Sequence, residues 1–231
     1  MKVKKKILNM NKPYVKKYTK IAGFTVWIVD GKYIRDNIEE EFTNYGQYYR
    51  FRFIPKKEFW IDEEHGYGRE EKYFIDHLLA EYKFMSNGMD YDSAIEKADL
   101  IEKRERSKDI LFRQIKEKKE TKKKIINQVH KKLLKRYSKK IRVWVINGML
   151  VRNIFFIDFT EGGHDKVYDF IPQNEIWLDD DTGLKERKFI LLHEIHERNL
   201  MAKGKDYESA HQSASEIEYF CRHHPKKIDR R

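Results

Sequence analysis

Two histidines and two glutamates lie within five residues of an otherwise apolar stretch, and their types and spacing suit metal chemistry. The stretch runs from Phe189 to Met201 and contains His193, Glu194, His196 and Glu197. On a helix, His193 and Glu197 share one face because they are four residues apart. Charged groups on a largely buried helix are costly unless they are paired or bind an ion. The pattern therefore predicts either a metal site or a buried hydrogen-bond network.

A second helix is expected to bring further ligands to the same point. His211 and Glu218 are seven residues apart, so both would lie on one face of that helix. If the two helices pack antiparallel, His211 meets His193 and Glu197, and a wider ligand set would include Glu218. Two imidazoles with one or two carboxylates suit zinc or another divalent first-row metal.

Other residues near this cluster are further candidates. If Glu194 and His196 turned inward together, the cluster would hold enough ligands for a dinuclear carboxylate site. His164 follows two glycines and would reach the metal if Gly162–Asp165 formed a flexible loop. A turn that joins two strands is the more common structure for such a sequence.

An internal repeat with a period of about 117 residues organises the chain. The strongest match pairs Phe53-Ile-Pro-x-x-Glu-Phe-Trp60 with Phe170-Ile-Pro-x-x-Glu-Ile-Trp177. A second match pairs Met85-x-x-Gly-x-Asp-Tyr-x-Ser-Ala94 with Met201-x-x-Gly-x-Asp-Tyr-x-Ser-Ala210. We infer two homologous modules that form an intramolecular pseudo-dimer, residues 1–105 and residues 106–231.

Each module has the pattern of an α+β fold: a basic segment, a small antiparallel sheet and two C-terminal helices. Residues 24–29 predict a strand, and the following Asp30-Gly31 predicts a hairpin turn. Residues 48–54 alternate like a half-buried strand, and residues 58–62 predict another short strand. Matched Arg35 and Arg152 suit structural salt bridges with acidic neighbours.

Helices are expected at the end of each module. Gly88 and Gly204 stand where a helix C-cap is expected, and Asp90 and Asp206 stand where an N-cap is expected. The second module also has a basic lead-in helix, in which residues 126–134 show helical spacing. The C-terminal helices are predicted at about residues 69–86, 91–105, 185–202 and 207–221.

The two copies differ at the candidate site. His193 and Glu197 correspond to His77 and Glu81, and Glu218 corresponds to Glu102. The other three positions are apolar in the first copy, where Leu78, Ala80 and Ile95 stand for Glu194, His196 and His211. Apolar replacements indicate positions that face inward. The sequence therefore predicts a degenerate, metal-free first module and a metal site in the second.

The second module resembles a known class of enzymes over about 45 residues. Asn174-Glu-Ile-Trp-Leu-Asp179, followed by Glu186-Arg-Lys-Phe-Ile-Leu-Leu-His193-Glu194, is similar to the small zincin-like metallopeptidases, particularly the phage-associated ImmA/IrrE type. In that family a strand precedes a helix that carries His-Glu-x-x-His.

The resemblance implies a role for each residue of the cluster. His193 would be a metal ligand, and Glu194 would be the general base that acts on a metal-bound water, as in a hydrolase. The third ligand would be His211 or Glu218. Glu197 stands in the position of the second motif histidine. A carboxylate there adds negative charge and lowers the Lewis acidity of the metal.

The charge distribution suggests a different function. The net charge is +11, and residues 1–20 hold eight lysines and no acidic residue. Residues 101–140 hold 17 basic residues against five acidic ones. These segments could bind nucleic acid or an acidic partner. The alternative is therefore a non-enzymatic nucleic-acid-binding or assembly protein in which the His/Glu cluster is structural.

The composition limits the cellular setting. No run of about 18 apolar residues occurs, so no transmembrane helix and no membrane partner are expected. The one cysteine excludes an internal disulfide. A cytoplasmic location is the simplest expectation.

Overall fold

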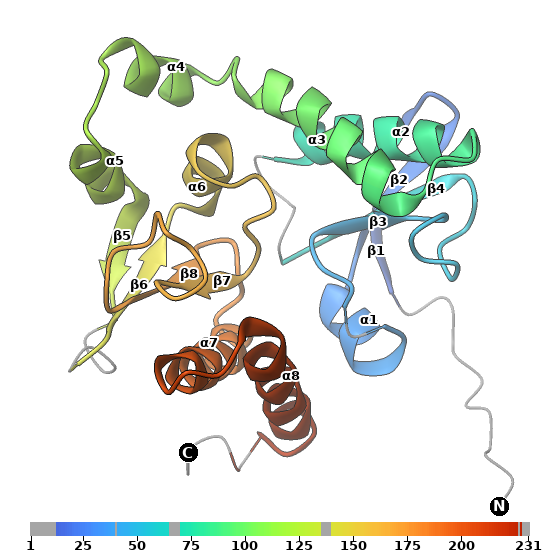
Figure 1. Cartoon of the computed structure of the whole chain (residues 1–231). Coiled ribbons are helices and arrows are strands. Elements are labelled where there is room, and N and C mark those ends of the chain that lie inside the picture. Colours follow the sequence, from blue (N-terminus) through green and yellow to red (C-terminus); the bar gives the residue numbers. More distant parts are fainter. Residues whose placement is uncertain (1–12, 40, 65–69, 135–139, 226, 228–231) are drawn as a thin grey trace, which may run out of the picture. The chain divides into compact units, whose positions relative to one another are not determined.

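The chain contains two four-stranded sheets with the same strand order, β1-β2-β4-β3 and β5-β6-β8-β7 (Figure 1). In both sheets the two central strands are parallel and the edge strands are antiparallel to them. Trp27 lies opposite Trp60, and Trp144 lies opposite Trp177, so the register is repeated as well. The α+β duplication is therefore confirmed. The first sheet comprises β1 (Tyr14–Ile21), β2 (Phe24–Val29), β3 (Tyr45–Gln47) and β4 (Glu58–Asp62), and the second comprises β5 (His130–Leu133), β6 (Arg142–Ile146), β7 (Gly162–His164) and β8 (Glu175–Asp179).

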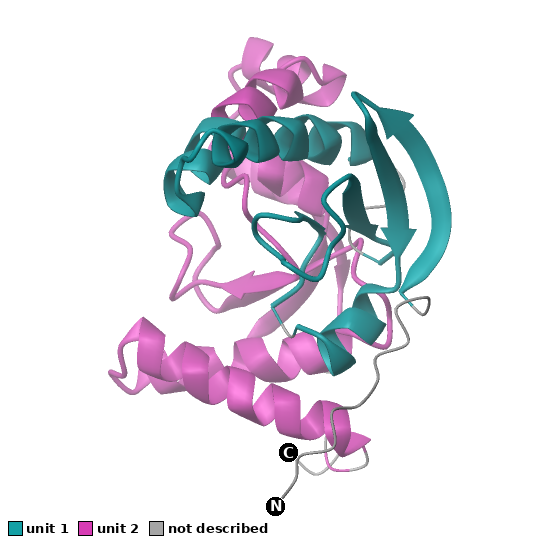
Figure 2. Cartoon of the chain, turned by 90° about the vertical axis from the view of Figure 1, so that its right-hand side faces the viewer, with its two compact units in different colours: residues 1–98 teal, residues 99–231 magenta. Residues whose placement is uncertain are grey.

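The computed structural model describes residues 13–39, 41–64, 70–134, 140–225 and 227. Two compact units, residues 1–98 and residues 99–231, are distinguished by colour in Figure 2. Much of the basic segment 1–20 lies outside the described residues. Among the residues that are described, no helix combines the length and apolar character that crossing a membrane requires.

A short helix follows the first central strand in each unit, so the hairpin predicted at Asp30-Gly31 is wrong. Helix α1 (Gly31–Asn37) begins there, and the side chain of Asp30 accepts a hydrogen bond from the backbone N–H of Tyr33. Helix α6 (Gly148–Ile154) begins in the same way after Asn147. Each helix starts a crossover connection, which is why the two central strands run parallel.

The strand predicted for residues 48–54 is also wrong. Strand β3 ends at Gln47, and turns follow. The N–H of Phe51 donates to the carbonyl of Gln47, and the N–H of Ile54 donates to the carbonyl of Phe51. These turns bury Phe51 and Ile54 in the core, and their spacing of three residues is that of turns and not the two-residue period of a strand.

The four C-terminal helices lie close to their predicted positions. Gly88 and Gly204 have φ values of +90° and +92°, as expected at helix C-termini. The side chains of Asp90 and Asp206 accept N-cap hydrogen bonds. The helices are α2 (Glu71–Ser86), α3 (Tyr91–Arg106), α7 (Arg187–Ala202) and α8 (Tyr207–His223).

The basic lead-in of the second unit is only partly helical. It forms α4 (Ile110–Glu117) and α5 (Lys122–Val129), and then the chain turns into β5. The helix predicted through residue 134 therefore ends at Val129, because the following residues pair with β6.

A buried ion pair anchors each crossover, as predicted for the matched arginines. Arg35 donates to Asp62 at 2.6 Å and to the carbonyl of Phe42 at 3.0 Å. Arg152 makes the same pair of contacts, with Asp179 and with the carbonyl of Phe159. The ion pair thereby fixes helix α1 to the end of strand β4 in the first unit and helix α6 to the end of strand β8 in the second.

Gly148→Ala is expected to destabilise the second unit by about 3 kcal/mol or more, the cost of breaking a buried ion pair. A Cβ atom on Gly148 would overlap the carboxylate of Asp179 and drive it from Arg152. Urea unfolding measures the loss. Gly204→Ala is the control, because its Cβ meets no atom within 4 Å and adds only the strain of a positive φ, about 1 kcal/mol. Equal losses in the two variants would contradict the overlap.

Candidate metal centre

Three ligand atoms from two helices converge in the second unit. Helix α7 carries His193 and Glu197 one turn apart, and α8 carries His211 beside them. His193 Nε2 lies 3.5 Å from Glu197 Oε2, and His211 Nδ1 lies 2.7 Å from the same oxygen. The two imidazole nitrogens are 3.2 Å apart. The sequence predicted this meeting of α7 and α8, and these three residues form a group that could hold a metal ion.

The spacing of the three atoms fits one small cation. Ligand atoms around a tetrahedral zinc with bonds of about 2.0–2.1 Å are about 3.3 Å apart. The observed separations, 2.7 to 3.5 Å, bracket that value. The side chain of His211 is 48% exposed, so the group is open to solvent on the side of α8.

The ring of His193 is oriented from behind by Glu218. His193 Nδ1 lies 2.9 Å from Glu218 Oε2, which leaves Nε2 to face the other ligands. Arg222 holds Glu218 through two hydrogen bonds of 2.9 and 2.7 Å, and it also pairs with Glu186. A carboxylate behind a ligand histidine fixes its tautomer and raises its basicity. Glu218 therefore supports His193 instead of joining the three converging atoms.

Glu218→Gln is expected to weaken metal binding by about 10- to 100-fold, the usual effect of removing such a supporting carboxylate. The amide keeps the size of the side chain but cannot stabilise the same charge on His193. Competition with a chromophoric zinc chelator measures the affinity. Glu216→Gln, an exposed glutamate on the same helix, is the control and should bind as the parent does. An unchanged affinity for Glu218→Gln would contradict the supporting role.

His164 orients the other carboxylate of the site. It is fully buried, and its Nε2 lies 2.9 Å from Glu197 Oε1. The backbone N–H of Lys166 donates to His164 Nδ1 at 3.1 Å, so Nε2 carries the proton and donates to Glu197. This bond turns the second oxygen of Glu197 toward His193 and His211. The flexible loop or turn predicted for residues 162–165 is wrong, because residues 162–164 form strand β7. His164 was a candidate ligand only on the flexible-loop interpretation, and the Gly-Gly-His sequence was its one signal.

Glu194 lies beside this group and is buried. His164, Glu194 and Glu197 form a second set of closely spaced ligand atoms. Gly162 makes room for Glu194, because a Cβ there would come within 3.1 Å of Glu194 Oε1 and 2.9 Å of Ile190. The close approach explains why a glycine stands at this position of β7.

The buried charges perturb one another strongly. Burial raises the pKa of Glu194 to about 8, and the nearby carboxylates of Glu197 and Glu218 add to the effect of burial. Burial lowers the pKa of His193, but hydrogen bonds to Glu197 and Glu218 outweigh it and raise the pKa to about 10. Burial also opposes ionisation of Glu197, yet bonds from its three histidines hold its pKa well below the usual range. Such mutual perturbation is typical of functional sites.

His196 lies apart from the converging atoms. Its Nε2 is 2.9 Å from Ser213 Oγ on α8. The structure therefore does not bring Glu194 and His196 inward together, as a dinuclear site would require. The predicted metal ligands were His193, Glu197, His211, His196 and Glu218, and the structure brings together the first three.

The first unit repeats the scaffold of the site with different side chains. Gln47 donates to Glu81 Oε1 at 2.5 Å, in place of His164, and His77 lies 3.2 Å from Glu81 Oε2. The equivalent of Gly162 is Tyr45, whose ring packs 5.3 Å from that of His77. With Leu78 and Ile95 at the positions of Glu194 and His211, this arrangement lacks both the buried carboxylate and the third ligand of the second unit.

No protein-family model, no curated protein and no solved structure matches the chain. The resemblance to zincin-like metallopeptidases therefore stays a prediction, and the functional assignment depends on the geometry of the site.

Proposed function

We propose that the second unit binds one divalent first-row metal ion through His193, Glu197 and His211. The observation that supports this most directly is the convergence of three ligand atoms at the spacing of a single coordination sphere. Two of the three side chains are also oriented by neighbouring side chains, the buried His164 and the half-buried Glu218, and such support is typical of metal sites. A hydrogen-bond network alone would not require two imidazole nitrogens to face each other.

Zinc fits these ligands best. Calcium and magnesium prefer shells made of oxygen atoms, whereas imidazole suits zinc and its first-row neighbours. Two imidazoles and one carboxylate occur in catalytic zinc sites, which keep a fourth position open for water or substrate. The exposure of His211 is consistent with such an open position.

We further propose that the site serves a metal-dependent hydrolysis. A bound divalent cation would supply the Lewis acidity that polarises a carbonyl or a water. Glu194 is the carboxyl group in place to accept a proton, since it is buried next to Glu197 and held there by the close approach of Gly162. Its pKa of about 8 would be lowered by the positive charge of a bound cation, which would ionise it for this role. His164 and Glu218 position Glu197 and His193 and take no proton from substrate.

The metal content of the purified protein tests the assignment. After loading with zinc and removal of the excess, elemental analysis should find about one zinc per chain, the content of a mononuclear site. His193→Ala should lose that zinc, because it removes a ligand and releases Glu218 from its partner. A parent protein without zinc, or a His193→Ala variant that keeps it, would overturn the proposal and favour a structural hydrogen-bond network.

A further inference from the structure

The loop between β3 and β4 in the first unit is strongly basic. Its residues 48–57 contain four cations, Arg50, Arg52, Lys56 and Lys57, and no acidic residue. The equivalent loop of the second unit, residues 165–174, contains one lysine and two aspartates. Repeats that share a scaffold therefore differ here in charge as well as at the metal centre.

The two loops share two backbone hydrogen bonds at equivalent positions, although Asn174 has a φ of +62° and its equivalent Lys57 does not have a positive φ. In the first unit, N–H groups of Phe51 and Ile54 donate to carbonyls three or four residues earlier, at 2.9 and 3.0 Å. The equivalent bonds from Tyr168 and Ile171 measure 3.1 Å each. The shared turns form with different side chains in the two units, so these turns do not require the basic residues of the first loop.

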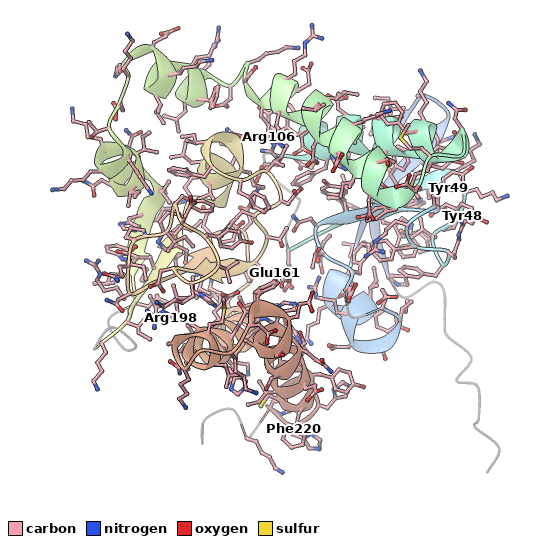
Figure 3. All side chains as sticks on the ribbon, in the orientation of Figure 1. Tyr48, Tyr49, Arg106, Glu161, Arg198 and Phe220 are labelled. Atoms are coloured by element: carbon pink, nitrogen blue, oxygen red, sulfur yellow. The ribbon has the colours of Figure 1, made fainter. Side chains whose placement is uncertain are left out.

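In the second unit an arginine from the neighbouring helix of the same unit pairs with an acidic residue of the loop. Arg198 on α7, labelled in Figure 3, donates to Asp165 at 2.5 and 3.1 Å and to Asn174 at 3.0 Å. This clamp closes the loop on the helix. In the first unit, Tyr82 stands in the place of Arg198. Tyr48 and Lys57 stand in the places of Asp165 and Asn174, and these side chains cannot form the clamp.

In the first unit the loop presents cations beside aromatic rings. The guanidinium of Arg52 lies 4.6 Å from the ring centre of Tyr48 and 5.4 Å from that of Tyr49. Lys56 lies 5.2 Å from Tyr48. Lys57 lies 5.0 Å from the ring of Phe24, at the start of β2. Figure 3 labels Tyr48 and Tyr49, which are neighbours in this loop.

These cations remain available to an outside partner. Arg52, Lys56 and Lys57 are exposed, and they form no ion pair within the part of the chain that the structure describes. Arg50 differs, because it pairs with Glu41 at 3.6 Å and lies over the ring of Tyr91. We therefore leave Arg50 out of the surface and define the 48–57 surface as Tyr48, Tyr49, Arg52, Lys56 and Lys57.

We propose that the 48–57 surface binds single-stranded nucleic acid. Its cations suit phosphates. The guanidinium of Arg52 lies over the ring of Tyr48, and these two groups offer flat faces on which an unpaired base can stack. An acidic peptide or an anionic membrane would use the cations but gain nothing from the stacked ring. A duplex would present its phosphates but keep its bases stacked on one another. This binding is independent of the metal centre.

Fluorescence anisotropy with a labelled oligothymidylate of about 20 nucleotides tests the proposal on the full chain. The triple variant R52Q/K56Q/K57Q should bind at least tenfold more weakly. The slope of log affinity against log salt should also become shallower by about two, the effect of losing three phosphate contacts to a single strand. Tyr48→Ala should cost about tenfold through lost stacking, whereas Tyr48→Phe should bind as the parent does.

The matched control removes three exposed lysines of the basic lead-in, K116Q/K123Q/K124Q. It should retain most of the affinity for the oligothymidylate. This result would show that binding depends on the 48–57 surface and not on the net positive charge of the protein. An equal loss in this control, or no loss in R52Q/K56Q/K57Q, would overturn the proposal. A parent protein that binds duplex DNA or phosphatidylserine vesicles as tightly as the oligothymidylate would overturn it too. Equal binding by Tyr48→Ala and Tyr48→Phe would likewise exclude base stacking.

Discussion

Replacing His211 with isoleucine should abolish metal binding by the second unit while its fold survives. The substitution removes one of three converging ligand atoms. Loss of a supporting residue behind a ligand already costs about 10- to 100-fold in affinity, so loss of a ligand should cost more than 100-fold. The side chain of His211 is about half exposed, and the first unit carries Ile95 at the same position of its own helix. Zinc affinity by chelator competition and the midpoint of urea unfolding measure the two effects.

His196→Ala is the matched control for this substitution. It also removes a histidine between α7 and α8, but one whose Nε2 is bonded to Ser213 and which does not belong to the group of converging ligand atoms. The variant should keep its zinc within a few-fold of the parent affinity. If His196→Ala lost the metal and His211→Ile kept it, the ligand set would be wrong, and a distorted α7 would have to bring His196 into the site.

The helices that carry the site could be predicted from the sequence because their signals are local. Apolar periodicity placed α7 and α8, and Gly204 and Asp206 marked the turn between them. Once two antiparallel helices are joined by a short turn, residues on facing sides must meet. The meeting of His193 and Glu197 with His211 follows from spacing alone.

The sheet was harder to predict because its decisive contacts are not local. Asp30-Gly31 has the composition of a tight turn and also of a helix N-terminus, and neighbouring residues do not distinguish the two. What selects the helix is the buried pair of Arg35 with Asp62, which requires Gly31 to pass close to that carboxylate. Those residues are 27 or more positions apart in the sequence, so no local sequence pattern includes both of them.

His164 illustrates the same limit at the site itself. It lies in a strand of three residues, 33 positions before its partner Glu197. Nothing in the local sequence marks it as buried. The repeat could have helped, since Gln47 stands at the equivalent place and both side chains donate to a glutamate on the following long helix.

Glu194→Gln should leave zinc binding unchanged and reduce metal-dependent hydrolysis by about 10²- to 10⁴-fold, the usual contribution of a general base. The amide has the size of the carboxylate, so the close packing against Gly162 is preserved. It cannot accept a proton from water. Zinc-loaded protein incubated with a casein digest and with p-nitrophenyl acetate, followed by mass spectrometry and absorbance, gives the rates.

The matched control is Glu216→Gln, which changes an exposed carboxylate on α8 and should keep the parent rate. A Glu194→Gln variant that binds zinc and hydrolyses as fast as the parent would show that another group takes the proton. If the zinc-loaded parent itself hydrolyses neither probe, hydrolysis of these two substrate classes is excluded while the metal centre stands. The two outcomes separate the chemistry of Glu194 from the binding of the ion, because Glu194 is not one of the three converging ligands.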